Sequence, residues 1–424
     1  MKILLVNKYL YPRGGDCLYT LRLMKLLTDA GHTVIPFSMH HPQNIKTDYD
    51  RYFVPYIDFR EELKRFDIKS AIKVVSRSIY NAKAVELMQQ VIEDHHPDII
   101  HLNNIHHQLT PAILKWPAKY NIPVVWTLHD YILSCPDNTF LRNGKICDKC
   151  AHGNNLYAIV HRCKKGSLGA SLIAVVECSF YYPKRLAKTV YKFISPSRFL
   201  ADTLTKNSLP DEKVANIPNF IPPLQLPSTG DDYFLYFGRL SGEKGVDTLL
   251  EAFAKLGKGK LIIAGDGPDR QKLENKSIEL NLTNASFVGY QTPESIFNLL
   301  SGCLASIVPS IWWENFPYSV MEAMAAGKPV IASTTGGIPE QIEHEKNGLL
   351  FEPGNAEQLA QCMARLYHDR KLAKELGQAG HDKTITEYSP ETHYQRIMKI
   401  YSEAVDKMKD SSSERRVQGH IHTA

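Results

Sequence analysis

The sequence lacks any long apolar run. Its start, MKILLVNKYLYPRGG, contains an apolar stretch that is too short for a secretory signal peptide. The longest later apolar stretch, ASLIAVV at 170–176, is far shorter than the roughly 20 residues that a membrane-spanning helix needs. We therefore expect a cytoplasmic protein rather than an exported or membrane-spanning one.

The sequence also lacks a large net charge, since 50 Lys and Arg residues face 45 Asp and Glu residues. We expect no nucleic-acid partner. The charge is uneven, however: residues 1–220 carry 29 basic and 19 acidic side chains, and residues 221–424 carry 21 and 26. A basic first half suits an anionic lipid surface or an anionic acceptor, and an uneven solvated surface is the alternative.

Two basic segments bear on this alternative. Residues 63–83 and 181–193 mix Lys and Arg with apolar residues at roughly helical spacing. Helices that lie on a membrane surface have this pattern, and so do amphipathic helices that pack on a core. The first interpretation predicts a protein that is peripheral on the inner face of the membrane.

Eight cysteines are present, and without an export signal they indicate metal binding or redox chemistry rather than a disulfide framework. Four of them are clustered at Cys135, Cys147, Cys150 and Cys163. Their spacings of twelve, three and thirteen residues suit a structural zinc site that fixes a long loop. Four reduced thiols in a packed loop are the alternative.

The chain is too long for one hydrophobic core, and its elements fall into two similar halves. Strand-like and helical segments alternate from KILLVN onward, which predicts a doubly wound parallel sheet, and the alternation restarts at YFLYFG. We expect the first α/β domain at 1–220, with a cysteine-containing insertion near 135–163, and a linker at 221–232. The second domain is expected at 233–385. A C-terminal helix at 386–408 should pack back on the first domain, and a disordered tail should follow at 409–424.

Two glutamates lie in an otherwise apolar or turn-forming stretch, IWWENFPYSVMEAMAAGKPVIAS at 311–333. Pro317 suits the first turn of a helix, so Glu314 falls in a loop after a strand and Glu322 just over one turn into the helix. Ligands bind at such strand ends in open α/β sheets, and the free N–H groups of a helix start, including that of Tyr318, can receive a phosphate. A rim carboxylate and a solvated helix residue are the alternatives.

Two more loops point to the same crevice. YFGRLSGEKG places Arg239 and Lys244 between a strand and a helix, where two cations can clamp a diphosphate. IIAGDGPD places Gly265 and Gly267 at another strand end, where backbone can approach a ligand closely or the chain can simply turn. With the glutamates, these loops predict a phosphate and ribose site.

These motifs resemble those of the retaining glycosyltransferases of family 4, which have the two-domain GT-B fold. The resemblance runs from Met1 to about residue 405, and its most specific parts are GRLSGEKG, AGDGP and the pair Glu314 and Glu322, which is similar to the E-x7-E motif of the family. It implies two Rossmann-like domains that face a central cleft. It also implies transfer from a nucleotide-sugar to a glycan or polyprenyl-linked acceptor, in cell-surface polysaccharide or glycoconjugate synthesis.

The resemblance assigns donor-binding roles to residues of the second half. These are Arg239 and Lys244 for the diphosphate, Glu314 for the sugar, Glu322 for the ribose, Asn315 and Phe316 for backbone contacts to sugar or phosphate, and Val288–Tyr290 for the base. The family often has a glycine where this chain has Pro317, and a proline has no N–H to donate there.

In the first half, Gly14 and Gly15 are similar to the glycine pair that faces the donor phosphate or the acceptor in this family, and a tight turn is the alternative. Many members follow the pair with x-Glu. Here Asp16 and Cys17 follow instead, so no acidic role is implied for them.

Polar loops follow two other predicted strands of the first half. His129, in TLHDY, would contact the donor sugar by resemblance, with Asp130 supporting it. IIHLNNIHHQLTP places His101, Asn103 and His106 on what we interpret as the acceptor side, although histidines in solvated loops are common.

No serine, cysteine or carboxylate stands out as a covalent nucleophile, which agrees with the front-face attack that the resemblance implies for a retaining enzyme. Arg239 and Lys244 would stabilise the leaving diphosphate in place of a metal, so we expect no cofactor for catalysis. A sugar-nucleotide epimerase, a phosphorylase and a non-catalytic nucleotide-sugar-binding protein are the alternatives. No pyridoxal-phosphate lysine, which a phosphorylase needs, is identifiable.

Overall fold

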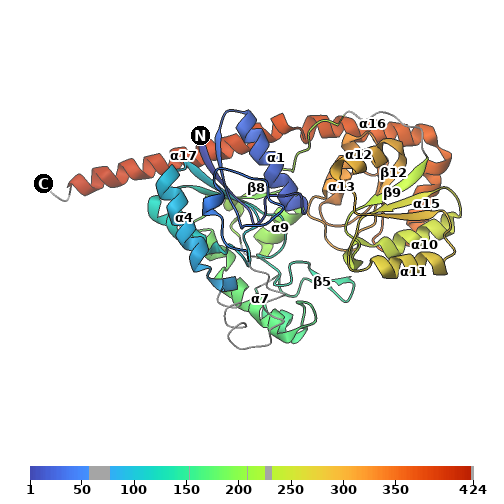
Figure 1. The fold of residues 1–424 in the computed structure, drawn as a ribbon, viewed down its shortest axis with the longest axis horizontal. Helices are drawn as coiled ribbons and strands as arrows, with labels where there is room; N and C mark the ends of the chain where they lie inside the picture. Colours follow the sequence, from blue (N-terminus) through green and yellow to red (C-terminus); the bar gives the residue numbers. More distant parts are fainter. Residues whose placement is uncertain (57–76, 152, 208, 225–231, 422–424) are drawn as a thin grey trace.

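The computed structural model describes residues 1–56, 77–151, 153–207, 209–224 and 232–421. In this part of the chain, two six-stranded parallel sheets form two α/β units that lie side by side (Figure 1). This confirms the expected pair of doubly wound, Rossmann-like domains. Most of the predicted linker 221–232 and of the basic segment 63–83 falls outside the described residues.

The first sheet has the strand order β2-β1-β3-β4-β7-β8. Its strands are β1 (Lys2–Val6), β2 (Thr33–Phe37), β3 (Ile99–Leu102), β4 (Val124–Thr127), β7 (Lys192–Ser195) and β8 (Val214–Asn216). The helices that accompany it are α1 (Gly15–Asp29), α4 (Ala82–His95), α5 (Lys115–Tyr120), α8 (Pro183–Leu186) and α9 (Arg198–Asn207). Apolar runs such as ILLV and VVW form its central strands because both faces of a covered parallel sheet are buried.

The segment between β4 and β7 is an insertion that extends away from this sheet (Figure 1). It contains the antiparallel pair β5 (Leu141–Arg142) and β6 (Lys145–Ile146), followed by α6 (Leu156–Val160) and α7 (Leu168–Phe180). Helices α6 and α7 pack on each other through a small apolar cluster that includes Ala158 and Val175.

The second sheet has the order β11-β10-β9-β12-β13-β14. Its strands are β9 (Tyr233–Phe237), β10 (Leu261–Ala264), β11 (Ala285–Gly289), β12 (Cys303–Val308), β13 (Val330–Ser333) and β14 (Leu349–Phe351). Its helices are α10 (Val246–Leu256), α11 (Arg270–Glu279), α12 (Pro293–Gly302), α13 (Tyr318–Ala325), α14 (Ile338–Gln341), α15 (Ala356–His368) and α16 (Arg370–Glu387). Strand order reverses beside β9, and such a switch point is where open α/β sheets bind ligands.

The last helix, α17 (Pro390–Ile421), leaves the second domain and runs back along the first (Figure 1). Its buried residues Ile397 and Tyr401 share one apolar cluster with residues of both sheets, such as Leu5 and Leu235. The structure continues this helix through Ile421, beyond the end expected at 408. The added stretch up to Gln418 contains no glycine or proline that would interrupt a helix.

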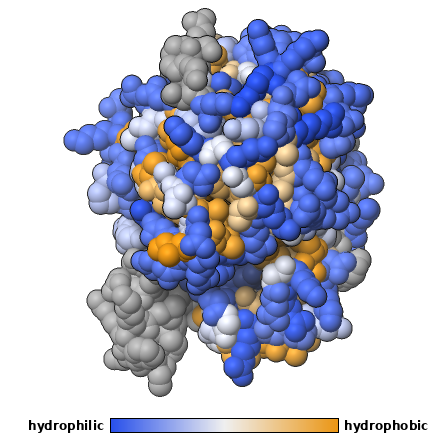
Figure 2. Space-filling model, turned by 90° about the vertical axis from the view of Figure 1, so that its right-hand side faces the viewer, coloured by the Kyte–Doolittle hydropathy of each residue, from blue (hydrophilic) through white to orange (hydrophobic). Residues whose placement is uncertain are grey.

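The surface on the side of the second domain is mostly hydrophilic, with hydrophobic residues exposed over the middle of this face (Figure 2). None of the helices among the described residues has the length and apolar character that crossing a membrane requires.

Candidate active site

A cavity of about 560 Å³ lies between the two domains, at the carboxyl ends of both parallel sheets. Its walls come mainly from the connections that follow β1, β4, β9 and β12. The sequence-predicted residues that line it are Gly14, Gly15, His129, Asp130, Arg239, Lys244, Glu314, Asn315, Phe316 and Glu322. The structure thus gathers the two glutamates, the two cations and the glycine pair in one place.

Glu314 is held tightly in the connection between β12 and α13. Its Oε1 accepts hydrogen bonds from the Lys244 ammonium at 2.7 Å and from the Ser310 hydroxyl at 2.6 Å. Burial raises the pKa of Glu314, but Lys244 and Ser310 outweigh this effect, and the pKa lies below its ordinary value. Glu314 is therefore a buried, ionised carboxylate beside a cation.

The loop that carries Arg239 and Lys244 is positioned by glycines. Gly245 has a φ of +68°, and a Cβ there would lie 1.9 Å from the carbonyl oxygen of Pro309 in the β12–α13 connection. A Cβ on Gly265 would lie 1.8 Å from the carbonyl oxygen of Gly238. These contacts bring three connections together at the cavity, and Arg239 remains exposed there.

Gly265 therefore has a different place from the one expected. It does not line the cavity, because its missing side chain makes room for the backbone at Gly238. Sequence could not distinguish these cases, since a close approach of backbone to backbone needs glycine as much as an approach of backbone to ligand does.

The start of α13 faces the cavity with Tyr318 and Ser319. Pro317 precedes the helix with φ −66°, and its position before the helix matches the expected start. The first N–H groups of a helix have no partner within the helix, so this end can bind an anion.

A smaller cavity of about 190 Å³ adjoins the first and shares Glu322 and Gly14 with it. Tyr290 and Gln291, which follow β11, line it from the second domain. Of the segment predicted for the base, Tyr290 lines this cavity, and Val288 lines neither cavity.

On the first domain, His129 lies at the cavity wall with a defined tautomer. The Asn103 amide donates to the carbonyl of Val6, so its Oδ1 accepts from His129 Nε2 at 3.0 Å. Burial lowers the pKa of His129. The imidazole is therefore neutral at pH 7, with Nδ1 unprotonated.

Asp16, to which the sequence assigned no role, also lines this wall. Its Oδ2 accepts from the Asn104 amide at 3.0 Å. Burial raises the pKa of Asp16, but His129, Lys8 and Asn104 more than offset it, so the pKa lies below its ordinary value. The only signal in the sequence was its place directly after the glycine pair.

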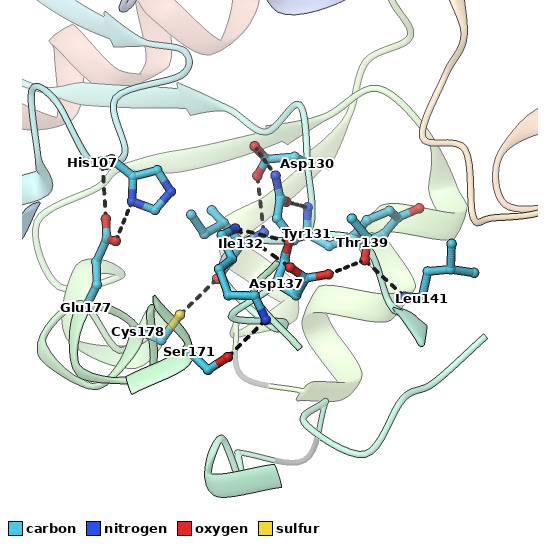
Figure 3. Close-up of polar contacts among 12 residues, drawn as sticks. His107, Asp130, Tyr131, Ile132, Asp137, Thr139, Leu141, Ser171, Glu177 and Cys178 are labelled. Carbon is cyan, nitrogen blue, oxygen red and sulfur yellow. Dashed lines mark hydrogen bonds and ion pairs between the residues drawn. The ribbon is translucent and has the colours of Figure 1, made fainter. Parts of the chain in front are cut away.

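Asp130 orders the loop after β4. Its carboxylate accepts from the N–H of Ile132 and from the amide of Asn138, both at 3.1 Å (Figure 3). The Asn138 side chain in turn accepts from the N–H of Tyr131 at 2.8 Å. Asp130 thus shapes the wall next to His129 in addition to lining the cavity.

The histidines expected on the acceptor side do not line the main cavity. His101 is fully buried between α17 and β4, where it contacts Tyr401 and the Thr127 hydroxyl. His106 is buried against Trp126, and burial lowers its pKa to about 3. Both residues are therefore neutral core groups, because the strand and its following loop turn these side chains inward.

The insertion is fastened to this same region by hydrogen bonds between Glu177 and His107. Glu177 of α7 accepts from both the N–H and Nδ1 of His107, at 3.1 and 2.5 Å (Figure 3). Burial raises the pKa of Glu177, but His107 is the largest opposing cause, and the pKa lies below its ordinary value. The Cys178 thiol, next in sequence, contacts the carbonyl of Ile132.

The four clustered cysteines lie in and beside the insertion, with Cys135 and Cys150 buried and Cys147 and Cys163 partly exposed. Burial raises the pKa of Cys150 to about 12. Within the residues described, no three His, Cys, Asp or Glu side chains gather closely enough to hold a metal ion. The zinc site stays a prediction from spacing.

Arg22 of α1 is a site residue for which the sequence held no signal. It reaches across the domain interface to Glu322, 300 positions away, at 3.1 Å. Nothing in a helical arginine on the surface of a Rossmann-like domain indicates a partner in another domain.

Two family models match this chain. "Glycosyltransferase Family 4" matches residues 14–223, and "Glycosyl transferases group 1" matches residues 221–383. An uncharacterised glycosyltransferase of Methanocaldococcus jannaschii is 27% identical over 96% of this chain and 99% of its own length. The N-acetyl-alpha-D-glucosaminyl L-malate synthase of Bacillus anthracis is 24% identical over 92% and 94%.

Solved structures share the fold. A glycosyltransferase from Rickettsia africae has a TM-score of 0.68 at 20% identity, covering 95% of this chain and 98% of its own. HepE of Anabaena, in complex with UDP-glucose, has a TM-score of 0.65 at 20% identity, covering 95% and 100%. Because the two family models together run through both domains without a gap, the chain belongs to family 4 of the glycosyltransferases.

Proposed function

We propose that this protein is a retaining glycosyltransferase that moves a sugar from a nucleoside diphosphate sugar to a hydroxyl group of a glycan or polyprenyl-linked acceptor. The observation that carries the proposal is the convergence of two cations and two carboxylates on one interdomain cavity. These are Arg239, Lys244, Glu314 and Glu322.

The diphosphate would bind between the cations and the start of α13. Lys244 Nζ lies 2.7 Å from Glu314 and 5.1 Å from the centre of the Trp312 ring, at the cavity wall. Arg239 reaches the same cavity from the same loop. Two positive charges and unpaired helix N–H groups together suit a group with two adjacent negative charges.

The two carboxylates would bind the neutral parts of the donor. Glu314, ionised and fixed by Ser310 and Lys244, can accept hydrogen bonds from hydroxyls of the transferred sugar. Glu322, just over one turn into α13, can accept them from the ribose, with the base in the smaller cavity beside Tyr290. His129, through its unprotonated Nδ1, offers one more acceptor to the sugar.

In the proposed reaction, the bond between the anomeric carbon and the diphosphate breaks. A bond from that carbon to the acceptor oxygen forms on the same face, and the acceptor proton passes to the departing diphosphate oxygen. Arg239 and Lys244 stabilise the negative charge on this oxygen, which is the main electrostatic contribution. The scheme uses no covalent enzyme nucleophile and no metal ion.

Two similar proteins support the substrate classes. HepE of Anabaena has been solved with UDP and with UDP-glucose, which makes a uridine nucleotide the first donor to test. A Klebsiella pneumoniae protein described as lying in a cps region is 26% identical over 80% of this chain and 87% of its own length. This supports a role in cell-surface polysaccharide synthesis.

The first domain would reach a lipid-linked acceptor at an anionic membrane surface. The projecting insertion exposes Leu156, Val160, Leu168 and Leu172, and its sequence also carries Lys149, Lys164 and Lys165. Apolar side chains beside cations suit the boundary of an anionic bilayer. If vesicles containing anionic lipid left the protein in the supernatant on sedimentation, this part of the proposal would be wrong.

The donor can be identified by a thermal-shift screen of UDP-, GDP- and ADP-sugars. A ligand that binds only the folded state raises the melting temperature, and we expect one nucleotide class to do so. Incubation with that donor should then release the nucleoside diphosphate and, with an acceptor, give a product with the donor's anomeric configuration by NMR. Release of an epimerised sugar would indicate an epimerase, and binding without turnover a non-catalytic protein.

A further inference from the structure

The carboxylate of Glu322 has a partner from the other domain. Arg22 of α1 donates from Nη2 to Glu322 Oε1 at 3.1 Å, and both side chains are 14% exposed. The Arg22 guanidinium also lies over the ring of Tyr318, with its carbon 4.7 Å from the ring centre. One arginine thus contacts two residues of α13 across the interface.

This contact occurs where the two cavities meet. Glu322 lines both, and Arg22 lines the smaller one together with Tyr290 and Gln291 from the opposite domain. In the described part of the chain, the Glu322 carboxylate makes its one hydrogen bond through Oε1, which leaves Oε2 for a ligand.

The arrangement is incompletely hydrogen-bonded. Arg22 Nη1 and the Tyr318 hydroxyl are both buried and have no hydrogen-bond partner among the described residues. Buried polar groups without partners are uncommon in folded proteins, and each calls for an explanation such as a functional role or a bound water or ion. These two flank the Arg22–Glu322 pair.

We propose that Arg22 is a positioning residue for the nucleotide donor: it holds Oε1 of Glu322 across the domain interface, so that Oε2 is presented to the ribose hydroxyls. This inference rests on the proposed donor. Arg22 and the ribose bind the carboxylate together, because a neutral hydroxyl cannot replace the charge of a guanidinium. Donor binding therefore depends on the approach of α1 to α13.

The charge of Glu322 depends on this one cation. Burial raises the pKa of Glu322, and Arg22 is the charged group that opposes this effect. The other titratable or charged groups on elements near Glu322 are Tyr318 on its own helix, Arg13 after β1, Asp16 on α1, Tyr290 before α12, Glu340 on α14, and His381 and Lys383 on α16. His381 and Lys383 donate to or contact the carbonyls of Ala325 and Glu340, and Arg22 is the charged group that acts on the pKa of Glu322.

The test compares UDP binding by the full-length wild type and Arg22→Gln at about pH 6 and about pH 8.5 by calorimetry. Without Arg22 the carboxyl protonates more readily, so we expect about tenfold weaker binding by the variant at the lower pH. The ratio of the two dissociation constants should fall at the higher pH, where Glu322 ionises again. Working with this ratio cancels the titration of UDP itself.

Three controls separate positioning from a merely structural effect. UDP that lacks the ribose 2′ and 3′ hydroxyls should bind wild type and Arg22→Gln equally. Arg22→Gln should have no further effect in a Glu322→Gln background. Lys25→Gln, at an exposed position of the same helix, should bind UDP as the wild type does.

Either of two results would overturn the role of Arg22 without overturning the proposed donor. The first is a ratio of the two dissociation constants that does not change with pH. The second is a loss of affinity for the dideoxy analogue, caused by Arg22→Gln, that equals the loss for UDP. In both cases wild-type binding of UDP would still stand. If the wild type bound none of UDP, GDP and ADP, the proposed donor class would fail, and the role of Arg22 with it.

Discussion

At the scale of single residues, the site is a set of charges that neutralise each other. Lys244 and Glu314 lie 2.7 Å apart, and Arg22 and Glu322 lie 3.1 Å apart. Each carboxylate is mostly buried and each has a cation, as buried charges require. The hydroxyls of a donor can bind both carboxylates without breaking either pair, and Arg239 supplies a further positive charge for its diphosphate.

Lys244→Ala should lower turnover by about 100- to 1,000-fold, because one cation at a developing negative charge contributes about that much. It should also lower the melting temperature, since Glu314 would be left buried beside Ser310 alone. Single-turnover rates at saturating donor would measure the first effect. Lys244→Arg, which keeps the charge, should recover the stability, and unaltered turnover in Lys244→Ala would remove this residue from the mechanism.

Because His101 is buried and neutral, we expect the stability of the fold to fall in acid. Burial, then His129 and His393, lowers its pKa to about 3, so it is neutral in the folded protein, whereas it binds a proton below about pH 6.5 when unfolded. The unfolded state thus binds more protons than the folded state at acidic pH. The contribution of His101 to the free energy of unfolding is fully present above pH 6.5 and is lost as the pH falls toward 3. Between pH 7 and 5 this single group accounts for about 2 kcal/mol.

His101→Gln should be less stable at neutral pH, but its free energy of unfolding should change less between pH 7 and 5 than that of the wild type. Urea unfolding at several pH values measures this difference. Parallel pH curves for the two proteins would show that His101 is not the group responsible.

At the scale of elements, one aromatic side chain fastens the β12–α13 connection of the second domain to the first. Trp313, next to Glu314, packs at 5.2 Å from the ring of Phe140 and 5.1 Å from that of Phe199. The neighbouring Asn315 amide donates to the carbonyl of Leu128 at 3.2 Å. The β12–α13 connection is therefore shared by both domains.

Trp313→Ala should cost about 2 kcal/mol of stability, because the side chain is only partly buried, and should raise the donor KM by freeing the loop of Glu314. Trp116→Ala removes another partly buried tryptophan, from α5, and should leave the donor KM unchanged. Equal effects of the two variants on KM would argue against a role for Trp313 in holding the loop.

The elements also show which features of the structure could be predicted from the sequence. Pro317 predicted the start of α13, and apolar runs predicted the strands, because caps and periodicity are local properties. The inward direction of His101 could not be predicted. It depends on α17, a helix 300 residues later, covering that face of the strand, and such packing is a tertiary property. Arg22 was missed for the same reason.

At the scale of the molecule, the two domains depend on a helix that belongs to neither sheet. Ile397, Tyr401 and Ala404 of α17 are fully buried in a cluster that includes strand residues from both domains. His393 connects α1 to the interdomain segment: its Nδ1 donates to the carbonyl of Pro218, so its Nε2 accepts from the hydroxyl of Tyr19 at 3.1 Å. The approach of α1 to α13 therefore depends on α17 as well as on the cleft.

A chain that ends at Ser389 should fail to fold stably. It would lose the burial of Ile397 and Tyr401 and leave apolar surface of the first sheet exposed, and each such side chain contributes about 1.5–3 kcal/mol. The total approaches the whole stability of a typical domain. A chain that ends at Asp410 keeps every buried residue of α17 up to Ala404 and should melt at the wild-type temperature. Calorimetry would measure the melting temperatures of both truncated proteins. A Ser389 truncation that melts at the wild-type temperature would show that α17 is dispensable to the interface.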